Sequence, residues 1–534
     1  MGRQLAILVA ALLVLAACGS DSDPGGTGGS GAGGGGGDPW LVETESGPVQ
    51  GTAIGTARAF LGIPYAAPPI DALRFKSPQP VEPWTEPLDG SEVGPACAQV
   101  SLLNGEVVSN TVEDCLTLNV WTPDASSSDP RPVLVWIHGG GFEGGSGHGD
   151  GATTGEHLAP AADAVVVTVN YRLGPFGFLA HPALTSEDPA RSTSGNYGLE
   201  DQRFALQWVQ ANVAAFGGDP NNVTVFGESA GGISLCLHLV SPESAGLLHQ
   251  AVIQSGPCDI RVTTLNAAEQ QGDELASAVD CDTATDVPAC LRDKSATEIL
   301  EALPGKAGLM FGEGADWGPN VDGVVLLDTA GNLLEAGTYQ DVPVVLGSTR
   351  DEGTLFVALA GLTDITETEY EDRVMAFAAE HGGDGTAALA RYPASAYDSP
   401  AAALSALLGH SVFSCPTRRA ARALAGHGTP TYLYQFTHAI PFGVAGDLGA
   451  FHSSELGFIF GASQFGSLTP EEQPLYETMQ GYWSQLAATG DPNGGTAPSW
   501  TAYDEAADNH LELDLTITER AGLLSDECDF WDEQ

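Results

Sequence analysis

Five consecutive residues, Gly227-Glu228-Ser229-Ala230-Gly231, constrain the fold of this chain more than any other stretch. A β-branched run at 222–226 leads directly into them, and a segment of small and apolar residues at 232–239 follows. This order predicts a strand, a sharp turn and a helix, with a glycine on each side of the serine where a Cβ would collide with neighbouring backbone. The pattern predicts that Ser229 is a nucleophile at the end of a sheet. The structural alternative is a serine that only caps the helix.

Strand-like and helix-like segments alternate from residue 40 onward, which is typical of an α/β protein. The predicted strands are short apolar or β-branched runs: 117–122, 133–137, 164–169, 223–226, 251–254, 342–346 and 431–436. Their near-continuous apolar character favours a mostly parallel sheet with helices on both faces. A helix is predicted over 201–216, with one apolar face made by Leu206, Val209, Val213 and Phe216. We find no repeat and no second linker, so residues 40–534 are expected to form one catalytic domain with long inserted loops.

The N-terminus has the pattern of an export signal. Arg3 precedes an apolar run at 5–15 that is too short to span a bilayer but fits a signal-peptide core. Leu15-Ala16-Ala17-Cys18 resembles the lipobox of bacterial lipoproteins, in which the cysteine becomes the lipidated first residue. We therefore expect a signal peptide over 1–17 and a lipid on Cys18. An ordinary cleaved signal with a chance cysteine is the alternative, and it would release the protein.

Residues 18–39 would follow the lipid as a flexible tether, because eleven of the 21 residues at 19–39 are glycine. The protein is then expected to be exported and held at the cell envelope, on the outer membrane or the cell surface. The membrane face and the oligomeric state are not determined by the sequence.

The composition excludes one class of partner. The chain has 69 acidic and 19 basic residues and a net charge of −50, and such a surface repels nucleic-acid phosphates. Eight cysteines remain when Cys18 is set aside, and an exported chain can keep disulfides, although spacing leaves the connectivity open. Neither a Cys-x-x-Cys pair nor a histidine-rich cluster indicates a metal site. No cofactor is expected.

A serine hydroxyl is a weak nucleophile, so Ser229 needs a base, an acid that orients the base, and donors for an oxyanion. The predicted strand 133–137 runs into His138-Gly139-Gly140-Gly141-Phe142. Glycines at the end of a central strand let backbone N–H groups turn toward a tetrahedral intermediate. We predict an oxyanion hole formed by the N–H groups of Gly140, Gly141 and Ala230.

The acid and the base each have two candidates. Asp351 and Glu352 both follow the predicted strand 342–346, and either could orient an imidazole. His438 and His452 both follow the predicted strand 431–436. Spacing alone does not separate the members of either pair.

Many segments, in the same order, resemble the type-B carboxylesterases, an α/β-hydrolase family that includes para-nitrobenzyl esterases and cholinesterases. The matching segments are 60–66, 73–75, 113–120, 138–142, 170–172, 198–202, 216–220, 227–231, 254–256, 321–323, 351–353 and 528–531. The resemblance implies the α/β-hydrolase fold and a triad of Ser229, Glu352 and His452. Glu352 is the glutamate of the family's Asp-Glu-Gly, and His452 is followed three residues later by an acid. Glu228 and Ser255 are implied as residues that support the triad.

The resemblance also implies disulfides and ion pairs. The implied disulfides are Cys97–Cys115, Cys281–Cys290 and Cys415–Cys528. Cys236 and Cys258 have no family partner, and we expect buried thiols there rather than an extra bridge. Arg74 with Glu113, and Asp201, are expected to be structural ion-pair positions.

The function implied is hydrolysis of carboxylic esters through an acyl-enzyme, with short to medium neutral esters as small-molecule substrates. The loop between Cys97 and Cys115 lacks the tryptophan with which cholinesterases bind a quaternary ammonium, so choline esters are not expected to be preferred. The alternatives are a lipase or amidase, or a non-catalytic binding protein on the same fold. The sequence does not determine the physiological substrate, the acyl-chain preference or the enantioselectivity.

Overall fold

The computed structural model describes residue 38 and residues 40–102, 104–124, 127, 129–259, 262–305, 314–441, 448–461 and 468–534. The predicted signal peptide 1–17 and the predicted lipid site Cys18 lie outside these residues, as does the tether apart from residue 38. Of the helices that the structure describes, none has the length and apolar character needed to cross a bilayer.

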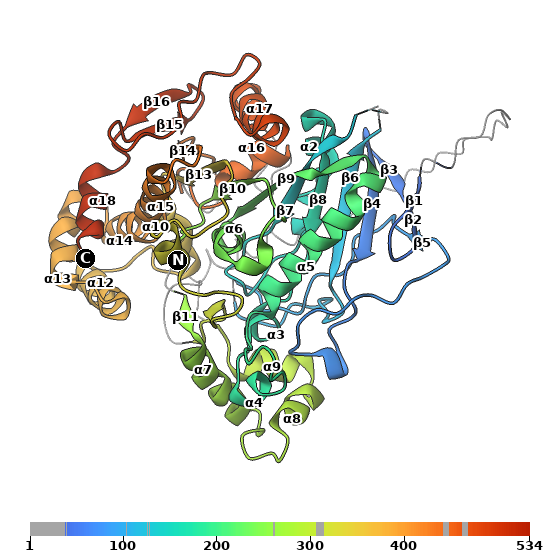
Figure 1. Cartoon of the computed structure of the whole chain (residues 1–534). Helices are drawn as coiled ribbons and strands as arrows, with labels where there is room; N and C mark the ends of the chain where they lie inside the picture. Colours follow the sequence, from blue (N-terminus) through green and yellow to red (C-terminus); the bar gives the residue numbers. More distant parts are fainter. Residues whose placement is uncertain are drawn as a thin grey trace.

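A sheet of eleven strands runs through the centre of the described chain (Figure 1). Its strands, in sheet order, are β16 (Thr518–Ala521), β15 (Asn509–Leu513), β14 (Thr431–Phe436), β13 (Val344–Thr349), β10 (Gln250–Gln254), β9 (Gly218–Glu228), β7 (Arg131–Ile137), β8 (Val165–Val169), β6 (Thr117–Pro123), β4 (Ala57–Pro64) and β3 (Thr52–Ile54). The strands from β15 to β8 pair in parallel, and the outer pairs are antiparallel. The predicted α/β fold with a mostly parallel sheet is confirmed.

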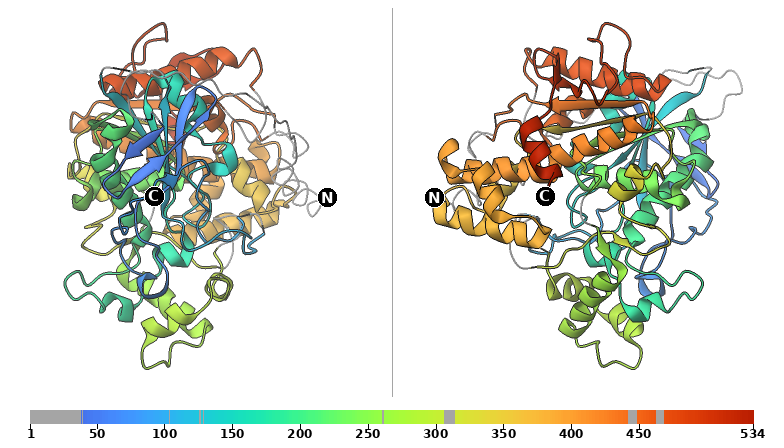
Figure 2. Two further views of the ribbon diagram at one scale, coloured as in Figure 1. Left: turned by 90° about the vertical axis from the view of Figure 1, so that its right-hand side faces the viewer. Right: turned by 60° about the vertical axis from the view of Figure 1, so that its left-hand side comes forward.

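Side chains of the central strands alternate between two buried layers, as strand geometry requires. In β7, Val133, Val135 and Ile137 face one apolar core, whereas Leu134 and Trp136 face the other. The first core also contains residues of α5 (Tyr197–Asn212), α6 (Ala230–Val240), α10 (Ala330–Glu335) and α15 (Cys415–Gly426). The second contains residues of α2 (Gly155–Ala162), α16 (Gly457–Phe460) and α17 (Gln473–Thr489). Helices therefore cover both faces of the sheet (Figures 1 and 2).

The helix predicted over 201–216 begins four residues earlier than expected. α5 starts at Tyr197 and ends at Asn212, and a short 3₁₀ helix, η3 (Val213–Phe216), continues it. All four residues of the predicted apolar face are buried against the sheet: Leu206, Val209, Val213 and Phe216. The periodicity located the buried face correctly, and that face continues through the 3₁₀ turn.

Two long insertions lie between strands in the C-terminal half of the chain. The first, between β10 and β13, contains α7 (Leu265–Ala278), α8 (Val287–Asp293) and α9 (Ala296–Ala302). The second, between β13 and β14, contains α11 (Gly353–Leu359), α12 (Glu367–His381), α13 (Gly385–Arg391) and α14 (Pro400–Leu408). Figures 1 and 2 show the helices α12 to α14 projecting to one side of the sheet, near the C-terminus.

The described chain contains four disulfides. The three implied by the resemblance are present: Cys97–Cys115, Cys281–Cys290 and Cys415–Cys528. The last one joins α15 to the C-terminal helix α18 (Ser525–Asp532). This number of disulfides is typical of an exported protein.

The expectation of thiols at Cys236 and Cys258 is wrong, because these residues form the fourth disulfide. α6 and the loop after β10 approach so closely that a Cβ added to Gly256 would lie 2.4 Å from the carbonyl carbon of Gly232. This approach brings the Cα atoms of the two cysteines to 5.2 Å, within the range that a disulfide spans.

Candidate active site

Ser229 lies on a sharp, strained turn between a strand and a helix. β9 ends at Glu228, α6 begins at Ala230, and Ser229 has φ 56° and ψ −123°. A non-glycine residue rarely adopts a positive φ, and such strain is concentrated at functional sites. The flanking glycines are required, because a Cβ on Gly231 would lie 2.0 Å from the carbonyl oxygen of Ile137 and one on Gly227 would lie 2.7 Å from Gly231. The strand, turn and helix predicted here are therefore present.

The glycine-rich loop after β7 passes directly beside this serine. A Cβ added to Gly139 would lie 3.0 Å from the Cβ of Ser229. Gly140, Gly141 and Phe142 all have positive φ values, of 105°, 61° and 63°. This conformation is stabilised by hydrogen bonds from the N–H groups of Glu143 and Gly144 to the carbonyl oxygen of Gly140, both at 3.0 Å. The loop thus turns back on itself next to the serine.

The three predicted donors lie on this loop and at the helix start. Within the described part of the chain, the N–H groups of Gly140 and Gly141 donate no hydrogen bond. Ala230 is the first residue of α6, where helix geometry leaves the N–H without an intrahelical acceptor. Such N–H groups can donate hydrogen bonds to an oxygen on which negative charge develops.

His452 and Glu352 form a buried pair. The distance between His452 Nδ1 and Glu352 Oε2 is 2.5 Å, and both side chains are almost fully buried. The other carboxylate oxygen of Glu352 accepts hydrogen bonds from Ser255 Oγ at 2.6 Å and from the N–H of Thr349 at 2.7 Å. The sequence predicts that Ser255 supports the triad, and in the structure its hydroxyl contacts the carboxylate that pairs with the imidazole.

The other imidazole nitrogen faces Glu228. His452 Nε2 lies 3.0 Å from Glu228 Oε1, and the same oxygen accepts a hydrogen bond from Ser453 Oγ at 2.6 Å. The Ser229 hydroxyl makes no hydrogen bond with His452 or with any other described residue. The imidazole thus contacts the residue immediately before the serine, and the expected contact with Ser229 itself is not formed in this structure.

Several carboxyl groups around the imidazole change its protonation. Burial alone lowers the pKa of His452, but the charges of Glu228 and Glu352, with a smaller contribution from Glu455, outweigh burial and raise it to about 9. Burial raises the pKa of Glu228, although His452 and Ser453 oppose this rise. Burial and the two neighbouring carboxylates raise the pKa of Glu455 to about 8. The cluster therefore retains protons at neutral pH.

Aromatic rings enclose the imidazole. The ring centroids of Phe356 and Phe413 each lie 4.9 Å from that of His452. Phe356 belongs to α11, and Phe413 belongs to a π-helix at Gly409–Ser414, a rare conformation that is often found at functional sites. Phe413 could not be predicted from the sequence, because its position depends on this local widening of the helix.

The remaining candidates of each pair lie in other surroundings. Both ring nitrogens of His438 are engaged, with Asp514 Oδ1 and Glu472 Oε1, each at 3.0 Å. Asp351 pairs with Arg350 at 2.7 Å and accepts a hydrogen bond from the N–H of Ala450. The structure therefore places Glu352 with His452 and leaves Asp351 and His438 outside the pair.

Two ion pairs, one buried and one partly buried, connect loops of the described chain. Arg172 donates to both carboxylate oxygens of Asp201 at 2.7 Å, and Arg74 binds both oxygens of Glu113. Next to Arg172, the hydroxyl of Tyr171 donates to the carbonyl oxygen of His138 at 2.9 Å. The expectation that these ion pairs are structural agrees with their positions. The described residues contain no group of three or more potential ligands that could hold a metal ion.

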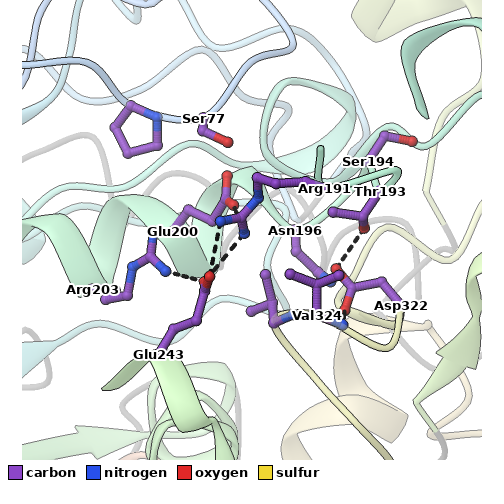
Figure 3. Close-up of polar contacts among 12 residues, drawn as sticks. Ser77, Arg191, Thr193, Ser194, Asn196, Glu200, Arg203, Glu243, Asp322 and Val324 are labelled. Carbon is purple, nitrogen blue, oxygen red and sulfur yellow. Dashed lines mark hydrogen bonds and ion pairs between the residues drawn. The ribbon is translucent and has the colours of Figure 1, made fainter. Parts of the chain in front are cut away.

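A polar cavity of about 190 Å³ lies between residues 75–79 and the start of α5. Arg191 lines it and pairs with Glu200 at 2.7 Å and Glu243 at 2.8 Å (Figure 3). None of the residues that line the cavity belongs to the candidate active site.

The fold and this site define an α/β-hydrolase with a serine on the turn after β9. A family model for the carboxylesterase family matches residues 38–531, so the chain belongs to the carboxylesterase family and is a carboxylic ester hydrolase. The chain is 36% identical over 485 residues to a fumonisin B1 esterase of Sphingopyxis macrogoltabida, covering 88% of this chain and 85% of the relative. It is 33% identical over 535 residues to an acetylcholinesterase of Bungarus fasciatus, covering 92% and 85%. The resemblance to type-B carboxylesterases is confirmed.

Proposed function

We propose that this protein hydrolyses short to medium-length neutral esters through an acyl-enzyme formed on Ser229. His452 acts as the base, and Glu352 holds the imidazole and stabilises its positive charge. The observation that carries the proposal is the 2.5 Å contact between His452 and Glu352, located beside the strained turn that presents Ser229.

The reaction begins when the proton between His452 Nε2 and Glu228 moves to the Glu228 carboxylate, and the neutral imidazole shifts to the neighbouring Ser229. His452 Nε2 takes the hydroxyl proton as Ser229 Oγ attacks the ester carbonyl carbon. The tetrahedral oxyanion accepts hydrogen bonds from the N–H groups of Gly140, Gly141 and Ala230. The imidazolium then protonates the leaving alcohol, and a water molecule releases the acid by the same steps.

Neutral esters suit the charge of the site. The carboxylates of Glu228 and Glu352 flank the imidazole, and the whole chain carries a charge of −50, so an anionic ester would be repelled. Both relatives bear the names of esterases, which supports ester rather than amide substrates. A lipase or an amidase is the alternative enzyme class.

The test is hydrolysis of para-nitrophenyl acetate and butyrate by the wild type and by Ser229→Ala. We expect turnover by the wild type and its loss in the variant, while Ser186→Ala at an exposed position keeps full activity. A fluorophosphonate should label Ser229, as shown by mass spectrometry. A wild type inert to every ester tested would favour a binding protein, and faster turnover of emulsified long-chain esters would favour a lipase.

We also propose that the single catalytic domain, residues 40–534, is anchored by a lipid on Cys18 after removal of residues 1–17. The lipobox-like sequence and the glycine-rich segment after it support this proposal. Mass spectrometry of the mature N-terminal peptide should find an acylated cysteine, and Cys18→Ser should release the protein from membranes. An unmodified N-terminus at another residue would contradict the anchor.

A further inference from the structure

Ser453, the residue after the proposed base, adopts a conformation that serine rarely tolerates. Its φ is 71°, in the left-handed region, where glycine is free of strain. Its hydroxyl donates to Glu228 Oε1 at 2.6 Å, and this is the oxygen that lies 3.0 Å from His452 Nε2. At this position glycine would relieve the backbone strain, but it would lack the hydroxyl that donates to the buried carboxylate.

We infer that Ser453 is a positioning residue that keeps the Glu228 carboxylate turned toward the imidazole of His452 and thereby keeps the proton on that imidazole in the resting enzyme. This inference rests on the proposed function, because it concerns the base of that reaction.

The charges around Glu228 allow two arrangements of one shared proton. The titratable groups that face it are His452, Glu352 after β13, Glu455 in η8 (Ser454–Leu456), Tyr171 after β8 and Tyr434 in β14. Either the imidazole is charged and Glu228 is ionised, or the imidazole is neutral and Glu228 is protonated. Only the second arrangement contains an imidazole that can accept the proton of Ser229.

Ser453 decides between these arrangements. A hydroxyl that donates to Glu228 Oε1 stabilises the ionised carboxylate, and it therefore favours the charged imidazole. The same bond fixes Oε1 next to His452 Nε2, so it also keeps this nitrogen away from Ser229. Without the hydroxyl, the proton moves more easily to Glu228, and the imidazole is more often neutral and free to turn to the serine.

The experiment measures kcat/KM for para-nitrophenyl acetate against pH in Ser453→Gly, which removes the hydroxyl and keeps the backbone conformation favourable. A hydrogen bond to a charged group shifts such an equilibrium by about tenfold or more, so we expect kcat/KM to rise by about fivefold to tenfold near pH 6.5 and to change little near pH 9.5. The matched control is Ser192→Gly, because Ser192 is an exposed serine that also has a positive φ, of 53°, and its pH profile should equal that of the wild type.

A second pair of variants tests whether the effect passes through Glu228. In a Glu228→Gln background there is no carboxylate to stabilise, so adding Ser453→Gly should leave the pH profile unchanged. A persisting effect in that background would overturn the inference, as would an equal loss of activity at every pH in the single variant. Ser229-dependent hydrolysis by the wild type is measured separately, so failure of the inference is distinguishable from failure of the proposed function.

Discussion

The buried carboxyl group of Glu455 should make the stability of this protein fall as the pH rises. Glu455 is fully buried in η8, its Oε1 accepts a hydrogen bond from Gln254 Nε2 at 3.1 Å, and its Oε2 has no partner among the described residues. Burial, followed by the charges of Glu228 and Glu352, raises its pKa from 4.5 to about 8. Ionising this group in the folded state is therefore unfavourable.

The sign follows from proton binding. A carboxyl group with a raised pKa in the folded state stabilises the fold below the pKa of the unfolded chain, and this contribution is lost as the pH rises through the folded pKa. The rise from 4.5 to about 8 corresponds to about 5 kcal/mol. In Glu455→Gln the amide has no proton to lose. The wild type should thus lose about 5 kcal/mol relative to this variant between about pH 4.5 and pH 8.

Urea unfolding followed by tryptophan fluorescence, at a series of pH values, measures this difference. The urea midpoint of the wild type should fall with rising pH more steeply than that of Glu455→Gln. Glu471→Gln, at an exposed position in the loop before α17, is the control and should follow the wild type. Parallel curves for the wild type and Glu455→Gln would refute the reasoning.

Three further predictions concern the proposed machinery and the C-terminus. Glu352→Gln should lower kcat for para-nitrophenyl butyrate by about 10³-fold to 10⁴-fold, because the amide does not stabilise the imidazolium; a loss below tenfold would contradict its role. Gly140→Ala should lower kcat by about 10²-fold or more, because its Cβ would lie 2.2 Å from the carbonyl oxygen of Gly144; unchanged kinetics would exclude the loop as an oxyanion hole. The double variant Cys415→Ser and Cys528→Ser opens a loop of 113 residues, and calorimetry should show a lower unfolding temperature, corresponding to about 5 kcal/mol; an unchanged temperature would contradict this estimate.

The central strands could be predicted from the sequence because their side chains are apolar on both faces. Val165 to Val169 is an uninterrupted β-branched run with every residue buried. β15 was not predicted, because Asn509-His510-Leu511-Glu512-Leu513 mixes polar and apolar residues in a short segment. The start of α5 was placed too late, because its first turn also contains a buried charged residue, Glu200.

Only those parts of the site that depend on neighbouring residues in the sequence could be predicted from it. The turn at Ser229 has a local signature of glycines, strand and helix. The choice between His438 and His452 depends on which carboxylates surround each ring in three dimensions, and the residues alone could not supply this. The disulfide between Cys236 and Cys258 depends on the close approach of two backbones, and the strained φ of Ser453 depends on the loop that it closes. Neither leaves a signal in the sequence.

The insertion between β13 and β14 has an apolar core of its own, formed by residues between Val357 and Leu408 with no contribution from the sheet strands. Glu352 lies at the start of this insertion, between β13 and α11, so the residue proposed to hold the imidazole stands at the junction of two separately packed regions. Regions with separate cores can open at different temperatures. Heating can therefore inactivate the enzyme by unfolding the insertion first. The fluorescence of tryptophans in the sheet, such as Trp136, would then still indicate a native core.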